Sequence, residues 1–361
     1  MRIGFFLRDL KIEGVQVVTL RLADTLVKMG HQCELITLND AQELELTSGI
    51  VHHSLDIKKR VSFKKSKRYV EQFLSCVDKL EYNCDKFDAI FSVHGETNDI
   101  ISYIDNPKFI HCIHNSDEYT YNNKNWFNKL KFKRKLSKKI KDKHVICVSN
   151  GIRDFVKSKT NSCALSISTI YNPFDIEKIK KLSLDDPIYQ LPQEYILFVG
   201  RLENQKNIPL LLDSVSKMTT NIPLVIIGEG SLEVELKQQA IKLGISDKVL
   251  FFPFCLNPYS IMRKARVLVL TSNYEGFGNV LVEALICHTS VISTDCPSGP
   301  NEILIDSLKD DLIFKFDSEV IAKKMDVILF SNEQRIPCYL YERFSAKLIA
   351  EKYIELVEAI N

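Results

Sequence analysis

Short apolar runs alternate with amphipathic stretches through most of the chain. In the first half, apolar runs at residues 3–7, 33–38, 89–93, 109–113 and 144–148 predict buried strands. Helical spacing of apolar residues separates the first two runs, and Lys28-Met29-Gly30 is a normal helix ending. Ser149 and Asn150 are predicted to cap a further helix at residues 151–157. Strands that alternate with helices predict a parallel sheet of the α/β class.

The second half of the chain repeats this pattern. The predicted strands are residues 195–199, 224–227, 249–253, 267–270 and 291–294, and the predicted helices are 209–218, 231–243, 259–265 and 280–287. A hinge is predicted near Tyr171-Asn172-Pro173-Phe174, and residues 181–194 are predicted to form an irregular connector. We therefore expect one domain at 1–172, a second at 173–344, and an amphipathic terminal helix at about 345–361.

Length and composition fit a two-domain globular protein. The chain has 361 residues, of which 45% are hydrophobic and 26% are charged. No apolar stretch approaches the roughly 20 residues of a membrane-spanning helix, and we expect no signal peptide at the charged N-terminus. The ten cysteines are scattered without a CxxC pair, which is typical of a reduced, cytoplasmic protein.

Positive charge is concentrated in the first half. Residues 1–172 carry 28 Lys and Arg against 20 Asp and Glu, whereas the remainder has a net charge of −6. Two basic clusters dominate: Lys58, Lys59, Arg60, Lys64, Lys65, Lys67 and Arg68, and Lys129, Lys131, Lys133, Arg134, Lys135, Lys138, Lys139, Lys141 and Lys143. Aromatic residues such as Trp126 and Phe127 accompany the second cluster, which fits either an anionic membrane surface or a solvated helix face. No nucleic-acid reader motif occurs, so we expect no nucleic-acid partner.

The segment from residue 267 to residue 302 holds the first candidate for chemistry. A predicted strand ends in turn-forming residues, and the tight loop Glu275-Gly276-Phe277-Gly278 then leads into a helix that starts near Asn279. Open α/β sheets bind ligands at the carboxyl ends of their strands. A helix that begins there offers free N–H groups and a positive dipole end, which suit a diphosphate.

A second candidate follows the predicted strand that ends at Gly200. Arg201 comes directly after this strand, and Lys206 follows within the same loop. Two fixed cations can stabilise the negative charge that develops on a departing nucleotide diphosphate. No Asp-x-Asp pair stands beside a predicted strand end to hold a metal. The sequence therefore favours a site that needs no metal.

These motifs resemble those of a known family. The spacing of Glu275 and Glu283 within EGFGNVLVEAL, together with Arg201 and Lys206, resembles the signature of retaining glycosyltransferases of family 4. The resemblance implies the GT-B fold, in which two doubly wound Rossmann-like domains face each other across a cleft. It also implies that the terminal helix crosses back to the first domain. The first domain would bind the acceptor and the second the nucleotide sugar.

The resemblance also implies roles for individual residues. Arg201 and Lys206 would grip the donor diphosphate, Glu283 would accept the ribose hydroxyls, and Glu275 would orient the donor sugar. Together with His114, the residues Glu275, Arg201 and Lys206 form the expected catalytic set. The expected donor-binding residues are Gly14, Gly200, Arg201, Lys206, Gly228, Glu275, Gly276, Phe277, Gly278, Asn279 and Glu283. No cofactor or metal is expected.

The first domain departs from the family pattern at one position and offers further candidate residues at two others. The family usually has two glycines after the first strand, whereas this chain has Glu13-Gly14. His114 ends a predicted strand where related enzymes carry a histidine near the reacting sugar, and the residues that follow, Asp117 and Glu118, could contact the acceptor. His94 ends another predicted strand and is a weaker candidate.

The sequence therefore predicts a hexosyltransferase. The loop Ser298-Gly299-Pro300-Asn301-Glu302 resembles that of many UDP-sugar-using members, so the expected donor is a UDP-sugar. A hexose or N-acetylhexosamine would pass, with retention, to a hydroxyl of a lipid-linked glycan in the assembly of lipopolysaccharide or capsule. The expected location is the cytoplasm, including the inner face of the plasma membrane. A GDP-mannose transferase, a UDP-sugar 2-epimerase and an inactive nucleotide-sugar-binding subunit remain alternatives.

Overall fold

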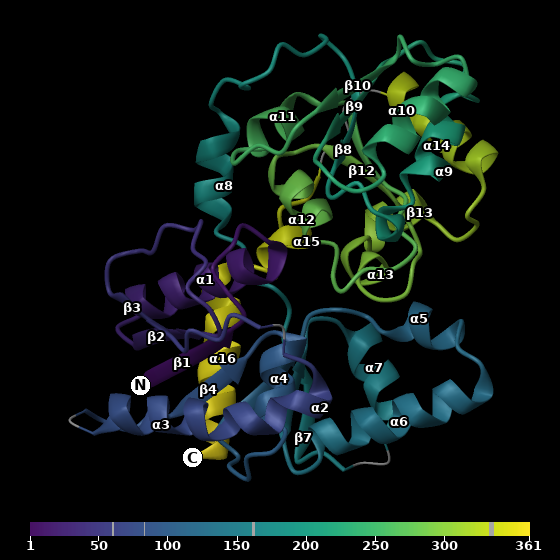
Figure 1. Ribbon diagram of the computed structural model, residues 1–361. Coiled ribbons are helices and arrows are strands. Elements are labelled where there is room, and N and C mark those ends of the chain that lie inside the picture. Colours follow the sequence, from purple (N-terminus) through teal and green to yellow (C-terminus); the bar gives the residue numbers. More distant parts are fainter. Residues whose placement is uncertain (60, 83, 161–162, 332–335) are drawn as a thin grey trace. The chain divides into compact units, whose positions relative to one another are not determined.

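The computed structural model describes residues 1–59, 61–82, 84–160, 163–331 and 336–361. It consists of two compact units, Met1–Phe174 with Phe344–Asn361, and Asp175–Arg343 (Figure 1). Each unit is a parallel β-sheet with helices, as the alternating pattern predicts. Of the two basic clusters, Arg60 lies outside the described residues.

The first unit contains a seven-stranded sheet in the order β3-β2-β1-β4-β5-β6-β7. The strands are β1 (Arg2–Leu7), β2 (Gln32–Thr37), β3 (Ile50–Ser54), β4 (Ala89–Ser92), β5 (Phe109–Ile113), β6 (His144–Cys147) and β7 (Ser166–Thr169). The helices are α1 (Gly14–Lys28), α2 (Phe63–Ser66), α3 (Val70–Glu81), α4 (Gly95–Ile101), α5 (Glu118–Asn122), α6 (Trp126–Ile140), α7 (Asn150–Lys159) and α16 (Ala346–Ile360). The chain adds strands outward in one direction from β1 to β3 and in the other from β4 to β7, so the winding reverses between β1 and β4.

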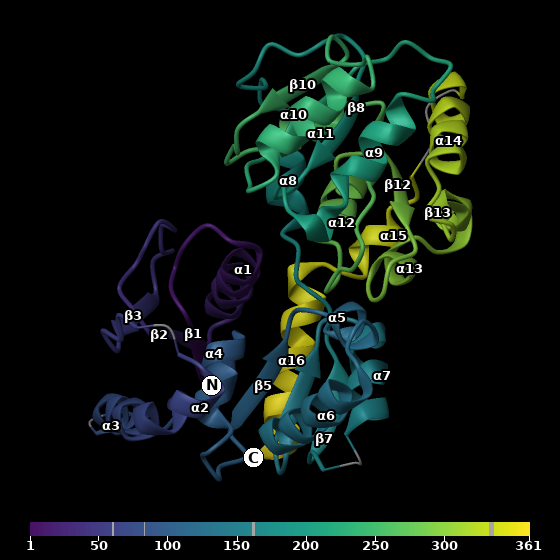
Figure 2. The same cartoon turned by 45° about the vertical axis from the view of Figure 1, so that its right-hand side comes forward.

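Alternate residues of β1 build two cores, one on each face of this sheet. Phe5 belongs to the core that includes Phe91 and, from the terminal helix α16, Tyr353. The ring centroids of Phe91 and Tyr353 are 5.0 Å apart. Phe6 points to the opposite face, where its ring stacks 4.3 Å from that of Phe73 on α3. Helix α16 is therefore part of the first unit's core, and it runs along the sheet in both Figure 1 and Figure 2.

The second unit contains a six-stranded sheet in the order β10-β9-β8-β11-β12-β13. The strands are β8 (Ile196–Val199), β9 (Leu224–Ile227), β10 (Val249–Phe252), β11 (Val267–Leu270), β12 (Ser290–Thr294) and β13 (Leu312–Ile313). The helices are α8 (Ile176–Ser183), α9 (Ile208–Val215), α10 (Glu233–Lys242), α11 (Tyr259–Lys264), α12 (Asn279–Ile286), α13 (Pro300–Ile303), α14 (Ser318–Phe330) and α15 (Tyr339–Glu342). Here the winding reverses between β8 and β11. Of the two central strands, β11 is buried throughout and β8 is buried except at its last residue, Val199, as expected for a sheet covered on both faces.

The sequence predicted ten strands that the structure contains, but it missed others. Strands β3, β7 and β13 were not predicted, and neither were helices α3 and α14. The expected irregular connector at 181–194 is wrong at its start, because α8 extends to Ser183.

The second basic cluster lies mainly on α6, where its lysines and arginine are largely exposed. Lys143 is an exception to the expected exposed cluster. It is buried, and its Nζ donates to the carbonyl oxygen of Ile104. All ten cysteines are free. No helix in the described part of the chain has the length and apolarity needed to cross a membrane.

Candidate functional site

The carboxyl ends of β8 and β11 form the centre of the second unit's candidate site. These strands are neighbours at the point where the winding of the sheet reverses. Loops that leave a doubly wound sheet on opposite faces separate at such a point and leave room for a ligand. The loop after β8 carries Arg201 and Lys206, and the loop after β11 carries Glu275. The fold thus brings together two motifs that lie about 70 residues apart in the sequence.

Lys206 and Glu275 form the closest charged contact of this site. Lys206 Nζ lies 2.6 Å from Glu275 Oε1, and both side chains are largely buried. The Ser272 hydroxyl donates to the same carboxylate oxygen at 2.6 Å. A carboxylate with only 6% of its residue surface exposed requires such partners, because burial of an unpaired charge is costly. Lysine has three N–H donors, so the ion pair leaves Lys206 capacity for a further anion.

Gln205 joins the same two loops through its amide. Its Nε2 donates to the carbonyl oxygen of Tyr274 at 3.0 Å, and its Oε1 accepts from Arg201 Nη2 at 3.2 Å. The backbone is tied as well, since Asn273 N donates to Gln205 O at 2.8 Å. Arg201 itself is exposed. The site therefore presents one exposed guanidinium beside one largely buried ammonium.

Two glycines are required by the backbone geometry. Gly228 follows β9 with φ of 147°, and a Cβ there would lie 2.0 Å from the carbonyl oxygen of Gly200. Gly278 has φ of 96° and is the residue that precedes α12. Left-handed backbone at this position turns the chain into the helix. The motif glycines thus hold the strand-end loops close together and set the direction of α12.

Helix α12 carries the second glutamate of the motif. Asn279 is its first residue, and Glu283 lies one turn later and is partly buried. Tyr259 Oη lies 3.5 Å from Glu283 Oε1. Phe277 is buried, whereas Glu283 keeps part of its surface in solvent. A carboxylate in this position can accept hydrogen bonds from neutral hydroxyl groups.

The predicted donor-binding residues divide between the two units. Nine of them share the carboxyl edge of the second sheet: Gly200, Arg201, Lys206, Gly228, Glu275, Gly276, Phe277, Gly278 and Asn279, with Glu283 on the following helix. Gly14 and His114 belong to the carboxyl edge of the first sheet, at the start of α1 and after β5. The described residues contain no group of three His, Cys, Asp or Glu side chains arranged to hold a metal ion.

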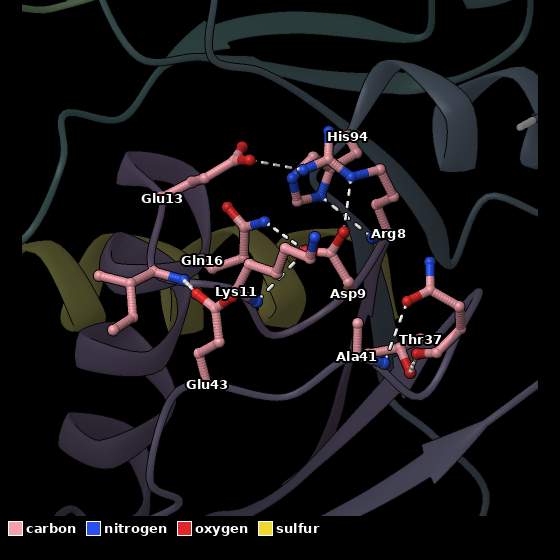
Figure 3. Close-up of polar contacts among 11 residues, drawn as sticks. Arg8, Asp9, Lys11, Glu13, Gln16, Thr37, Ala41, Glu43 and His94 are labelled. Atoms are coloured by element: carbon pink, nitrogen blue, oxygen red, sulfur yellow. Dashed lines mark hydrogen bonds and ion pairs between the residues drawn. The ribbon is translucent and has the colours of Figure 1, made fainter. Parts of the chain in front are cut away.

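A polar cluster surrounds Arg8 at the carboxyl end of β1 (Figure 3). Arg8 Nε donates to Asp9 Oδ2 at 2.8 Å, and Arg8 Nη2 donates to Glu13 Oε1 at 3.0 Å. Asp9 also accepts from the buried amide of Gln16 at 2.7 Å, and its hydrogen bonds hold the pKa of that carboxyl below its usual range despite burial. Gly14 opens α1, and a Cβ on it would meet nothing within 4 Å. Glu13, which replaces the expected glycine, is therefore an ion-pair partner of Arg8.

Two histidines lie at the same edge of the first sheet. His94 follows β4 and His114 follows β5, which are adjacent strands. Burial, together with the neighbouring charge of Arg8, lowers the pKa of His94 to about 3. Burial also lowers the pKa of His114 to about 4. Both imidazoles are consequently neutral near pH 7.

Sequence reasoning missed several residues that shape the two edges. Ser272 was identified only as a turn residue, although its hydroxyl binds Glu275. Gln205 stood within the motif without a role, although its amide joins the two loops. Arg8 and Asp9 directly follow the first strand, and that position was a usable signal for a place at the ligand edge.

Two family profiles match the chain, one in each half. The profile "Glycosyltransferase Family 4" matches residues 12–178, and "Glycosyl transferases group 1" matches residues 186–343. Among solved structures, HepE of Anabaena in complex with UDP and glucose aligns with a TM-score of 0.76 over 99% of this chain and 100% of that one, at 16% identity. That similarity shows a shared fold.

Curated relatives are similar over shorter segments. An N-acetylgalactosamine-N,N'-diacetylbacillosaminyl-diphospho-undecaprenol 4-alpha-N-acetylgalactosaminyltransferase of Campylobacter jejuni is 39% identical over 150 residues, 42% of this chain and 40% of that protein. A lipopolysaccharide 1,6-galactosyltransferase of Salmonella typhimurium is 32% identical over 173 residues, 46% of this chain and 47% of that protein. The chain thus covers less than half the length of these relatives.

Proposed function

The chain belongs to the family 4 glycosyltransferases of GT-B fold, and from this premise we propose that it moves a hexose or N-acetylhexosamine from a UDP-sugar, with retention, to a glycan hydroxyl. The acceptor glycan is lipid-linked and serves the assembly of a surface polysaccharide. Relatives that act in lipopolysaccharide and undecaprenol-linked glycan synthesis support this assignment.

One observation carries the proposal, the contact between Lys206 and Glu275 at the reversal point of the second sheet. In the proposed site, Lys206 and the exposed Arg201 bind the donor diphosphate and stabilise the charge that develops as the nucleotide leaves. The N-terminus of α12 adds a favourable dipole. Glu275 fixes Lys206 and orients the donor sugar, while Glu283 accepts the ribose hydroxyls.

The donor is proposed as UDP because of the loop at residues 298–302 and because HepE of Anabaena has been solved with UDP and with UDP-glucose. For the transfer step, we propose attack of the acceptor hydroxyl on the same face from which the phosphate leaves. The leaving phosphate oxygen then receives the hydroxyl proton. His114 lies near the anomeric carbon in this scheme and contributes a neutral imidazole.

No metal is required in the proposed mechanism. Two cations and a helix N-terminus already face the diphosphate, and Mg²⁺ would need carboxylates placed for octahedral coordination. Transfer is therefore expected to continue in excess EDTA. An assay that stops with EDTA and recovers with Mg²⁺ or Mn²⁺ would contradict this part of the proposal.

The lipid-linked acceptor implies a membrane surface near the first unit. Helix α6 exposes Trp126 and Phe127 at its start, with 77% and 68% of their surfaces accessible, and basic side chains along its length. Aromatic rings beside basic side chains are the combination that binds anionic lipid surfaces. We propose that α6 contributes to reversible binding at the cytoplasmic membrane face.

The function is tested by UDP release from a panel of UDP-sugars with alkyl glycosides as acceptors. NMR of the product at the anomeric position then reports retention. If GDP-mannose is turned over and no UDP-sugar is, the donor is GDP-mannose. Formation of a free 2-epimer would indicate an epimerase. UDP binding without turnover of any sugar would indicate an inactive nucleotide-sugar-binding subunit.

A further inference from the structure

At the reversal point of the first sheet, a hydrogen bond joins Arg8 to His94 and determines which ring nitrogen of His94 is protonated. Arg8 and His94 follow the adjacent strands β1 and β4, and the backbone N–H of Arg8 donates to His94 Nδ1 at 3.3 Å. This point is the counterpart of the one that holds Lys206 and Glu275 in the second sheet. Reversal points are the places where doubly wound sheets bind ligands.

The contact with Arg8 decides which nitrogen of His94 carries the proton. A backbone N–H can only donate, so Nδ1 must be the unprotonated acceptor. The ring is neutral because burial lowers its pKa to about 3. Its single proton therefore resides on Nε2. Within the described residues, Nε2 is buried and has no hydrogen-bond partner.

A buried N–H donor without an acceptor costs about 1–3 kcal/mol, so its presence at a ligand edge calls for a reason. His114 Nε2, from the next strand, is buried and unpartnered in the same way within the described residues. The solvent side of the cluster is the Arg8–Glu13 ion pair, whose side chains are 32% and 48% exposed. In the inference below, a ligand reaches the imidazole by displacing this exposed ion pair.

The charges of the cluster select the kind of ligand. Asp9 and Glu13 both bind Arg8, so the two carboxylates outnumber the single guanidinium. A neutral imidazole donor beside carboxylate acceptors does not favour a phosphate. It matches a group that both donates and accepts hydrogen bonds, and the hydroxyls of a sugar have this property.

We propose that His94 is a substrate-binding residue whose Nε2–H donates to a sugar hydroxyl at the reversal point of the first sheet. This inference rests on the proposed function for the supply of sugars. The hydroxyl belongs either to the transferred sugar or to the acceptor sugar, and the two arms of the experiment below separate these sources.

The first experiment does not depend on turnover. Nitrogen NMR of protein labelled at histidine, with the His94 signals assigned through His94→Phe, reports the tautomer and the state of Nε2. We expect a protonated Nε2 in the free protein and a shift of its resonance when alkyl glycosides or UDP-sugars are added. A protonated Nδ1, or no shift with any of these sugars, would overturn the proposal. Alkyl glycosides contain no nucleotide, so this result is independent of whether the protein uses UDP.

The second experiment compares kinetics of two His94 variants and a control. His94→Phe removes the donor and should lower kcat/KM at least tenfold, whereas His94→Gln keeps an N–H donor and should recover most of the loss. The control is His144→Phe, because His144 lies at the start of β6 with Nδ1 bonded to Ser166 and should leave kcat/KM unchanged. UDP affinity, measured by calorimetry, should be the same in all variants.

Comparison of hydrolysis with transfer shows which sugar carries the hydroxyl that binds His94. A loss in hydrolysis of the UDP-sugar without acceptor assigns it to the transferred sugar. A loss confined to transfer, with a raised KM for the alkyl glycoside, assigns it to the acceptor. Unchanged kinetics in folded His94→Phe would overturn the inference, as would equal losses in both His94 variants accompanied by a lower thermal midpoint. A parent that neither binds UDP nor turns over UDP-sugars would contradict the proposed function instead.

Discussion

Lys206 Nζ lies 2.6 Å from Glu275 Oε1, across the point where the winding of the second sheet reverses. Each residue is in a loop that follows a central strand of the buried sheet, so the rigid sheet fixes their separation. The pair neutralises a buried carboxylate and holds the ammonium group at the ligand edge. A single contact thus contributes to both stability and the proposed chemistry, and these two contributions can be measured separately.

Removal of Lys206 should destabilise the protein far more than removal of an exposed partner. Lys206→Ala leaves the Glu275 carboxylate buried and unpaired, which should cost about 3 kcal/mol. The matched control is Lys237→Ala, because Lys237 and Glu233 form an ion pair of the same 2.6 Å length whose side chains are 51% and 39% exposed. Such a pair on a helix surface contributes only about 0.3–0.5 kcal/mol.

Urea unfolding of the two variants and the parent measures this difference. Adding Glu275→Gln to Lys206→Ala should recover part of the lost stability, since no buried charge is then unpaired. If the urea midpoint of Lys206→Ala is no lower than that of Lys237→Ala, the buried ion pair stabilises the protein no more than an exposed one.

The two glutamates should differ in their effects on binding and on turnover. Glu283→Ala should weaken UDP binding, because a carboxylate that accepts ribose hydroxyls makes charge-assisted hydrogen bonds. Glu275→Gln should reduce turnover more than UDP affinity. Calorimetry with UDP and initial rates with a UDP-sugar measure the two effects. Tyr259→Phe is the control for indirect effects through the Tyr259–Glu283 contact. Equal losses of UDP affinity in both glutamate variants would contradict the proposed division of roles.

The central strands and the second site could be predicted because their signals are local. Buried strands such as β11 are uninterrupted apolar runs, and the residues after them follow directly in the sequence. Edge strands gave no such signal: β3 contains His52 and His53, and β7 has only half-buried residues. Helix α14 was predictable in retrospect, because Asp317 caps it through hydrogen bonds to Glu319 N and Val320 N.

The contacts within the sites could not be predicted, because they depend on which strands become neighbours. His94 and Arg8 are 86 residues apart, and only the adjacency of β1 and β4 brings them together. The same holds for Gln205 and Tyr274, which are 69 residues apart. Burial of Lys143 was also invisible in the sequence, where it stood among exposed basic residues.

Membrane binding should depend on the exposed aromatic residues of α6 and on salt. Trp126→Ala with Phe127→Ala should reduce sedimentation with anionic vesicles, because these rings are the apolar part of the proposed surface. Binding should fall steeply between low and high salt, since screening weakens the attraction of the basic side chains. The control is Tyr82→Ala, which removes an aromatic residue that is 83% exposed elsewhere on the first unit. Equal partitioning to anionic and neutral vesicles, or none to either, would favour a simple solvated helix face.

Acid should destabilise the protein partly through His111. This side chain is 1% exposed, and burial together with the charges of Lys143 and Lys139 lowers its pKa to about 3. Between the unfolded pKa of about 6.5 and this value, the unfolded chain binds a proton that the native protein does not. The contribution of His111 to the free energy of unfolding is therefore fully present above pH 6.5. It falls by about 1.4 kcal/mol per pH unit as the pH decreases toward the native pKa.

Replacement of the titrating ring isolates that contribution. In His111→Phe, the pH dependence of the unfolding free energy that comes from this group is absent, while other groups titrate as in the parent. The difference in unfolding free energy between parent and variant should therefore shift in favour of the variant from pH 6.5 to pH 4.5. Urea unfolding at several pH values measures it. A difference that is constant over this range would show that the pKa of His111 is not lowered in the native state.

The central claim is that the second unit binds the diphosphate of a sugar donor, and the rate of UDP release by Arg201→Ala tests it most directly. Arg201 is exposed, and its guanidinium donates to Gln205 of the same loop, so its removal should leave the fold intact. The loss of one preorganised cation should lower turnover about 100-fold or more. Arg263→Ala, which removes an exposed arginine of α11, should turn over at the parent rate. A folded Arg201→Ala variant that releases UDP within about threefold of the parent rate, less than 1 kcal/mol in activation free energy, would contradict the account.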